Sequence, residues 1–131
     1  MCRILKRSCV LSIIPDFLLK RVYKKGSLRE TAEGIAFDLK NIFGPGSITG
    51  INFIKINDIN YETPFIKIIT QGASTIASHI SPDNPMCFKL NQETTCLLEG
   101  ARSLKEGLNK IIVELITRDI GIIQVTLTDT I

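Results

Sequence analysis

The sequence predicts an all-β protein: a single β-sandwich of the immunoglobulin-like or Greek-key type, with about eight short strands and a short N-terminal helix or arm. Three observations lead to this prediction. Isoleucine occurs 22 times against 13 leucines, and β-branched side chains favour a pleated sheet over a helix. From residue 34 onward, short apolar runs alternate with turn residues at fairly even intervals. The 131 residues, 44% hydrophobic and 22% charged, suit one globular core.

The N-terminal part of the chain differs from the rest in charge. Residues 1–29 carry eight basic residues against Asp16 alone, whereas the remainder carries eight basic and twelve acidic residues. We treat residues 1–15 as an N-terminal extension, whose order the sequence leaves open, and residues 16–131 as one domain. In "PDFLLKRVYKKG" an early proline and aspartate, late basic residues and a final glycine predict a short helix. An edge strand through "LLKRVY" is the alternative.

The first strands follow from apolar alternation. "GIAFDLK", residues 34–40, alternates as a strand with one buried face does. The next residues, Gly44-Pro45-Gly46-Ser47, suit a type II turn, which predicts a positive φ at Gly46. Residues 48–57 continue as a strand, but the apolar parity slips between Phe53 and Ile54, so we expect a β-bulge or a change of sheet there.

Later strands are separated by turn dipeptides at Asn57-Asp58 and Gln71-Gly72, and a proline-punctuated loop follows "STIASHI". "MCFKL" and "TTCLLEG" flank residues 91–92 as a predicted hairpin that sets Cys87 opposite Cys96. A disulfide is then geometrically conceivable, although free thiols are the expectation for a cytosolic chain. Residues 111–128 read as two strands joined by a turn at 118–121, with an unusual φ at Gly121 and the first strand in a central position.

The sequence contains no strong motif for catalysis, nucleotide binding or metal binding. The glycines of "FGPGSITG" lack the spacing of a phosphate-binding loop and precede a strand rather than a helix. The single histidine, His79, could pair with Cys87 as a nucleophilic couple, but a surface role is the simpler interpretation. Carboxylates stand singly on different predicted strands: Asp38, Glu62, Glu99, Glu114 and Asp129. The four cysteines lack zinc-site spacing. We therefore expect no catalytic residues, no cofactor and no metal.

The basic N-terminal residues are the candidate contact site, for a partner protein or for nucleic acid. They are Arg3, Lys6, Arg7, Lys20, Arg21, Lys24, Lys25 and Arg29. A solvated extension is the simpler interpretation of the same charges. The leading functional prediction is a non-catalytic binding or assembly module with a protein partner or a second copy; nucleic-acid binding is the alternative, and an enzyme is a third class. No run approaches the length of a bilayer span and no signal-peptide cleavage site follows the N-terminus, so we expect a cytoplasmic protein without membrane contact.

Three motifs carry a family resemblance. They are Lys-Gly-Ser-Leu at 25–28, Gly-x-x-Phe-x-Leu-x-Asn at 34–41 and Pro-Gly-x-Ile-x-Gly at 45–50. With the later "ISPDNPMCFKL" and the closing pair of strands, the chain resembles a small prokaryotic β-sandwich family over nearly all of residues 18–129. Its members sometimes carry the label hydroxymethylglutaryl-CoA reductase. That label implies a nicotinamide-dependent reductase, yet the chain has no motif to which a dinucleotide site or reductase residues can be assigned.

Overall fold

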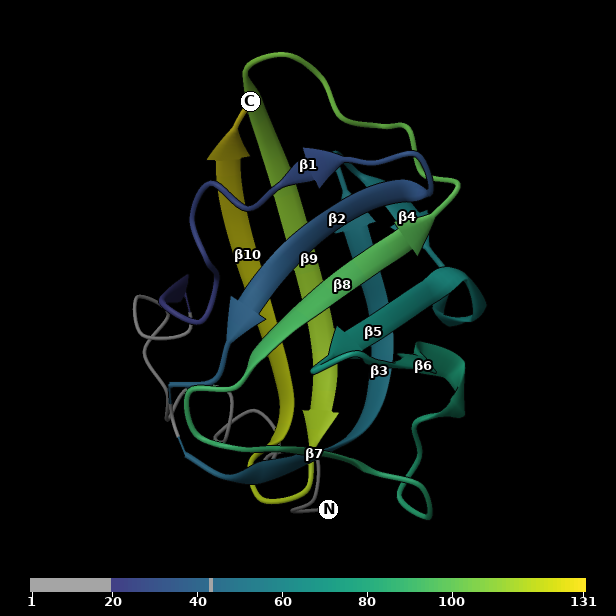
Figure 1. Cartoon of the computed structure of the whole chain (residues 1–131), viewed down its shortest axis with the longest axis vertical. Coiled ribbons are helices and arrows are strands. Elements are labelled where there is room, and N and C mark those ends of the chain that lie inside the picture. Colours follow the sequence, from purple (N-terminus) through teal and green to yellow (C-terminus); the bar gives the residue numbers. More distant parts are fainter. Residues whose placement is uncertain (1–19, 43) are drawn as a thin grey trace, which may run out of the picture.

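The computed structural model of the chain describes residues 20–42 and 44–131, which form ten strands in two facing antiparallel sheets (Figure 1). The strands are β1 (Arg29–Glu30), β2 (Gly34–Lys40), β3 (Gly46–Ile56), β4 (Ile59–Tyr61), β5 (Ile66–Thr70), β6 (Ala73–Ile76), β7 (Met86–Phe88), β8 (Glu93–Glu99), β9 (Leu108–Thr117) and β10 (Gly121–Thr130). Two short 3₁₀ helices, η1 (Thr63–Phe65) and η2 (Ala77–His79), lie between strands. The predicted all-β sandwich is confirmed, with two strands more than the eight expected.

The first sheet has the strand order β1-β2-β8-β5-β6, and the second has the order β10-β9-β3-β4 with β7 beside the start of β3. Four neighbouring pairs are consecutive in the chain, whereas β8 joins β2 to β5 and β3 joins β9 to β7 across long stretches of sequence. The chain therefore passes repeatedly from one sheet to the other. The predicted central position of the strand that starts at residue 111 is confirmed, because β9 lies between β10 and β3. In the described residues, no helix is long and apolar enough to cross a bilayer.

The core lies between the sheets and follows the two-residue period of the strands. Ile35 and Phe37 of β2 face Ile54 of β3 and Ile111 of β9, and all four side chains are fully buried. Gly34 starts β2 where the chain passes close to β8: a Cβ atom there would lie 2.0 Å from the carbonyl oxygen of Leu98. Only glycine fits this position.

Several predicted turns are confirmed by backbone geometry. Asn57 and Asp58 have φ values of 51° and 70° and join β3 to β4, as a two-residue hairpin of the primed type requires. Gly121, with φ of 91°, follows the turn from β9 to β10. The prediction for Gly46 is wrong: Gly44 takes the positive φ, 110°, and Gly46 is already the first residue of β3. The strand begins earlier because residues 46–48 pair with β7.

The predicted N-terminal helix is wrong over residues 21–26, and residues 15–19 lie outside the described part of the chain. Lys20 is helical, the chain turns at residues 21–22, and Tyr23 then forms a β-bridge with Leu39. The amide of Lys40 donates to the carbonyl of Val22 at 2.7 Å. Among its described residues, the edge-strand alternative through residues 18–23 holds only at Val22 and Tyr23, where the backbone bonds to β2; Lys20 and Arg21 are not extended.

The predicted hairpin of Cys87 and Cys96 is also wrong. Cys87 lies on β7 in the second sheet, and Cys96 lies on β8 in the first, opposite Phe37 and Ile68; both thiols are free. A turn does form at residues 89–92, but Asn41 binds it, with its side-chain amide donating to the carbonyl of Lys89 at 3.1 Å. These bonds anchor the turn to the end of β2 instead of closing a hairpin.

The predicted irregularity in β3 is confirmed, although both register shifts precede the parity slip between Phe53 and Ile54. The pairing of β3 with β9 shifts register between Ile48 and Gly50 and again between Ile51 and Phe53. Each shift is the signature of a β-bulge.

Candidate functional site

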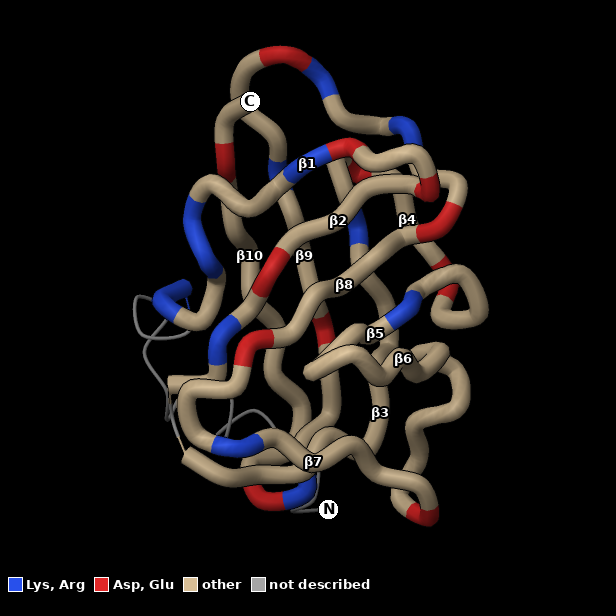
Figure 2. The backbone as a smooth tube through the Cα atoms, viewed as in Figure 1, with Lys and Arg blue, Asp and Glu red and all other residues tan. Residues whose placement is uncertain are grey.

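The basic residues singled out from the sequence are partly neutralised by the sandwich. Three of the eight, Arg3, Lys6 and Arg7, lie outside the described residues. Lys24 Nζ lies 3.2 Å from Glu93 Oε1, and Arg29 Nη2 lies 3.4 Å from Asp38 Oδ1. Figure 2 shows these basic positions on β1 and the segment before it, beside the acidic positions of β2 and β8. Two of the five described basic residues of this segment are therefore paired with carboxylates of the domain.

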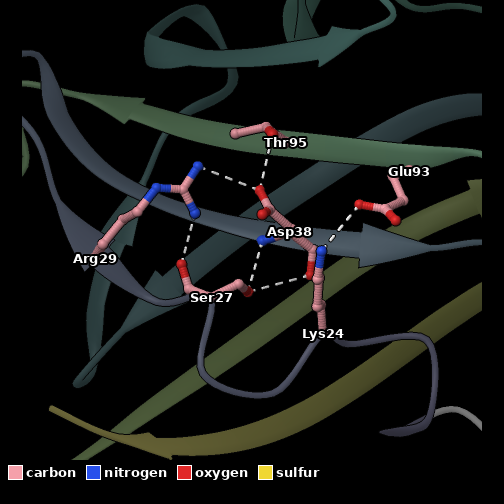
Figure 3. Close-up of polar contacts among 6 residues, drawn as sticks. All are labelled: Lys24, Ser27, Arg29, Asp38, Glu93 and Thr95. Atoms are coloured by element: carbon pink, nitrogen blue, oxygen red, sulfur yellow. Dashed lines mark hydrogen bonds and ion pairs between the residues drawn. The ribbon is translucent and has the colours of Figure 1, made fainter.

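Asp38 is the centre of this polar network on the outer face of β2 (Figure 3). Its Oδ1 accepts hydrogen bonds from Thr95 Oγ1 at 2.8 Å and from Arg29 Nη2 at 3.4 Å. Arg29 Nη1 donates to the carbonyl of Ser27 at 2.7 Å, and the amide of Asp38 donates to Ser27 Oγ at 2.9 Å. The network fixes the segment that precedes β1 against the sheet.

The remaining described basic residues, Lys20, Arg21 and Lys25, are exposed. Lys25 belongs to the surroundings of Asp129, where its charge helps to lower the pKa of that carboxyl. Nucleic-acid contacts by the eight basic residues stay a prediction.

Tyr23 and Asp129 join the N-terminal segment to the last strand. The Tyr23 hydroxyl and the Gly26 amide both donate to Asp129 Oδ2, the latter at 2.8 Å. Burial alone would raise the pKa of Asp129, but these hydrogen bonds, with one from the Thr130 amide, lower it below its ordinary value. Burial and the bond to Asp129 raise the pKa of Tyr23 well above its usual range. The pair is a neutral phenol on a carboxylate, which suits an anchor.

The groups considered for catalysis are not brought together. His79 is exposed at the end of η2, and its carbonyl accepts from Asn84. Cys87 lies 3.9 Å from Ser47 Oγ. Burial raises the pKa of the Cys96 thiol to about 12, with Asp38 adding to the rise. Within residues 20–42 and 44–131, no three His, Cys, Asp or Glu side chains are grouped as a metal site would require.

The carboxylates named from the sequence also have separate surroundings. Glu99 pairs with Lys67 at 3.2 Å, and Glu114 accepts from Asn52 Nδ2 at 2.7 Å. Asp38 and Asp129 belong to the two networks above, and Glu62 is exposed beside η1. No two of these five share a hydrogen-bond or ion-pair partner in the described structure, so they do not form a linked pair of the kind that glycosidases use.

The inward side chains of four strands are well buried at one end of the sandwich and only half-buried at the other. On β9, Ile111 is fully buried and Val113 is 5% exposed, but Leu115 is half-buried. The same change runs along β10, from Leu127 to Ile123. Leu39 on β2 and Ile48 on β3 are half-buried as well. The two sheets are thus closed at the end that holds Ile111 and open at the other.

A cavity of about 230 Å³ occupies this open end. Aliphatic side chains from both sheets line it, among them Leu39, Ile48, Val113, Leu115, Ile123 and Val125. The glycine-rich turn at residues 44–46 forms part of its wall, so the stretch that first suggested a phosphate loop borders an apolar space instead. A cavity of this kind can accept an apolar guest.

Thr94 of β8 is the exceptional polar residue of this wall. Its side chain points inward at a position opposite Leu39, and the residue is only 4% exposed. Thr94 Oγ1 is the one buried side-chain polar atom of the described residues that has no hydrogen-bond partner. A buried, unpaired hydroxyl is costly in a folded protein and calls for an explanation.

The edge of β10 is the second unusual surface. β10 is ten residues long, and among the described residues it pairs only with β9, without a register shift. The other three sheet edges are formed by short strands: β1 has two residues, β6 has four, and β4 and β7, which share one edge, have three each. Short edges resist pairing with other chains, whereas a long regular edge invites it.

Sequence reasoning missed both the cavity and the β10 edge as sites. The only sequence signal for the cavity was a threonine at an apolar parity position in "ETTCLLE". The signal for the edge was stronger: residues 121–130 contain no Lys, Arg or Pro, the residues that commonly protect edges.

Residues 18–131 match a family model described as the hydroxymethylglutaryl-CoA reductase N-terminal domain. The description names the N-terminal domain, and the match covers every strand of the sandwich. A search of curated proteins found no match.

Proposed function

We propose that this chain, which belongs to the hydroxymethylglutaryl-CoA reductase N-terminal domain family, is a non-catalytic assembly module that pairs with a second copy of itself along β10. The observation that carries the proposal is the long, regular edge of β10, whose one charged residue, Asp129, is buried, beside three short edges. The family description fits a non-catalytic role, since it names an N-terminal domain.

Pairing by strand addition uses backbone groups that would otherwise face water. A strand of ten residues offers about five outward N–H and C=O pairs, because alternate residues of an antiparallel edge point their backbone groups away from the sheet. A symmetric partner supplies the same number from its own β10. Such an isologous contact closes as a dimer and leaves no further long edge for growth.

The side chains along β10 also suit a second copy. The outward-facing residues Gln124, Thr126 and Thr128 are exposed and uncharged, and β-branched cross-strand pairs stabilise sheets. The single charge of the strand, Asp129, is buried against Tyr23. Two copies would therefore meet without like charges opposite each other. In Figure 2, β10 is drawn in tan, the colour of uncharged residues, with one red acidic position near its end.

Sedimentation of the full chain over a wide range of concentrations tests the proposal. Thr126 is near the midpoint of β10, so Thr126→Lys puts two like charges close together in an antiparallel pair. We expect the dimer dissociation constant to rise roughly fivefold or more, equivalent to ~1 kcal/mol. The matched control is Ser74→Lys on the short edge strand β6, which should leave the constant unchanged. A wild-type chain that stays monomeric at all concentrations contradicts the proposal.

A further inference from the structure

The space between the sheets extends deeper than the open cavity. A second cavity of about 30 Å³ lies against it, toward Ile54, Ile68 and Cys96. The two share part of their walls, including Leu39, Thr94 and Val113. Sandwich cores normally fill such space with side chains. The two cavities therefore lie at the same end of the sandwich, and together they run from the surface toward the core.

The wall chemistry restricts what can occupy this space. Most of the wall is apolar, and none of its described residues is Lys or Arg. The single charged residue of the described wall, Asp119, is acidic and exposed at the mouth. A carboxylate or phosphate group would enter without a cation to pair with it, at high cost. An uncharged aliphatic occupant meets no such penalty.

Thr94 supplies an independent indication of a polar group on the occupant. Its unpartnered Oγ1 belongs to a side chain that lines both cavities. A threonine hydroxyl can donate and accept, and rotation about χ1 exchanges the places of its hydroxyl and methyl groups. A hydroxyl on the occupant would satisfy the one buried polar side-chain atom that the described protein leaves unpaired.

The size of the space sets the length of the occupant. An apolar cavity of roughly 150 Å³ stays dry and binds benzene. The larger cavity here, about 230 Å³, has room for somewhat more than an aromatic ring. Because the cavity narrows from an open mouth toward the core, an elongated shape fits better than a broad one.

From these observations we infer that the open end of the sandwich is a binding site for an uncharged, medium-length aliphatic alcohol, whose hydroxyl pairs with Thr94. This inference goes beyond self-association through β10 and does not depend on it. The site uses the inner face of the sheets, whereas the proposed dimer uses the backbone edge.

Titration of the full chain with 1-octanol, followed by methyl NMR, tests the inference. Methyl signals of Ile48 and Ile123, which line the cavity, should shift and saturate. The signals of Ile56 and Ile111, buried at the closed end, should stay in place and serve as the internal control. Octanoate, which has the same chain and a negative charge, should bind at least tenfold more weakly. Shifts spread over both ends, or no shifts, overturn the inference.

Two variants separate the parts of the inference. Thr94→Val keeps the shape of the side chain and removes the hydroxyl, and should weaken octanol binding about fivefold. Val125→Phe fills the cavity from β10 and should abolish binding while the Ile111 signal is unchanged. Equal binding by wild type and both variants places the alcohol elsewhere and overturns the inference.

A chain that starts at residue 18, where the family match begins, tests whether residues 1–17 occupy the cavity instead of an alcohol. If this shortened chain binds octanol and the full chain does not, residues 1–17 fill the cavity and the alcohol site is wrong. We expect the two chains to bind equally. Sedimentation of the same samples reports separately on the proposed dimer, so that failure of one proposal leaves the other measurable.

Discussion

Adjacent threonines on β8 should respond to the same substitution with opposite signs. Thr94 points inward, is 4% exposed and has no partner for Oγ1. Thr95 points outward and donates to Asp38 Oδ1 at 2.8 Å. Replacement of either by valine keeps a β-branched side chain in a strand, so that backbone propensity contributes equally to both variants.

The magnitudes follow from the hydrogen bonds. A buried hydroxyl without a partner costs about 1–3 kcal/mol, so Thr94→Val should raise the free energy of unfolding by about 1–2 kcal/mol. A hydrogen bond contributes roughly 0.5–1.5 kcal/mol, somewhat more to a charged acceptor, so Thr95→Val should lower it by about 1 kcal/mol. For a domain of this size, 1 kcal/mol corresponds to a change in Tm of roughly 3–6 °C.

Urea unfolding of the two variants and the wild type measures the difference. The m-values should agree, because the surface exposed on unfolding is unchanged. Bound apolar molecules are removed from the samples before unfolding, because a ligand bound near Thr94 would stabilise the wild type. A Thr94→Val variant that is less stable than the wild type, or no more stable than Thr95→Val, refutes the assignment of Thr94 as an unsatisfied buried hydroxyl.

Three further predictions concern the N-terminal anchor, the start of β2 and the buried thiol. Tyr23→Phe removes the side-chain hydrogen bond that Tyr23 donates to Asp129. Folding lowers the pKa of Asp129 below its unfolded value of about 3.9. The pair therefore stabilises the folded protein fully above that value, and this contribution is lost as pH falls through the folded pKa. Urea unfolding at neutral pH should therefore show a loss of about 1–3 kcal/mol that disappears in acid, and a loss independent of pH would show that Asp129 is not the partner. Gly34→Ala should cost about 3 kcal/mol or more by calorimetry, because its Cβ would meet backbone; Gly26→Ala, which also has positive φ but opens to free space, should cost only about 1–2 kcal/mol. Burial raises the pKa of Cys96 to about 12, so a thiol reagent detected by mass spectrometry should leave Cys96 unmodified until urea unfolds the chain, and labelling of all four cysteines in the native protein would contradict its burial.

The local features of the fold could be predicted because they are written in short stretches. The alternation of residues 34–40 and 111–128 survives as β2, β9 and β10, since each strand has one face toward the core. The dipeptides at 57–58 and 71–72 predicted their turns because Asn, Asp and Gly tolerate positive φ.

Strand partners could not be predicted in the same way. Two apolar runs flank residues 91–92, which favoured a hairpin with Cys87 opposite Cys96. In the structure, the strands that hold these two residues pair with strands from other parts of the chain. The predicted helix failed over residues 21–26 for a similar reason, because Tyr23 is held by Asp129, 106 residues away. Such contacts depend on which strands meet in space, and apolar periodicity alone does not encode that.

The candidate site was the least predictable part. The cavity arises where four strands reach the same end of the sandwich with half-buried side chains, and no single stretch carries that information. The charges of the N-terminal segment were visible in the sequence, whereas the ion pairs of Lys24 and Arg29 that partly neutralise them were not. The lack of catalytic motifs and the basic N-terminal segment predicted a binding module, and the geometry supplies the surfaces on which that proposal rests.

Amide hydrogen exchange of β10 at low and high protein concentration tests the central claim most directly. Self-association through this edge predicts that alternate amides of residues 121–130, those pointing away from β9, gain protection as concentration rises. The amides of β6, a short edge at the opposite side of the other sheet, should exchange at the same rate throughout. If the β10 amides exchange equally fast at all concentrations, the strand is not the interface and the proposed assembly is wrong.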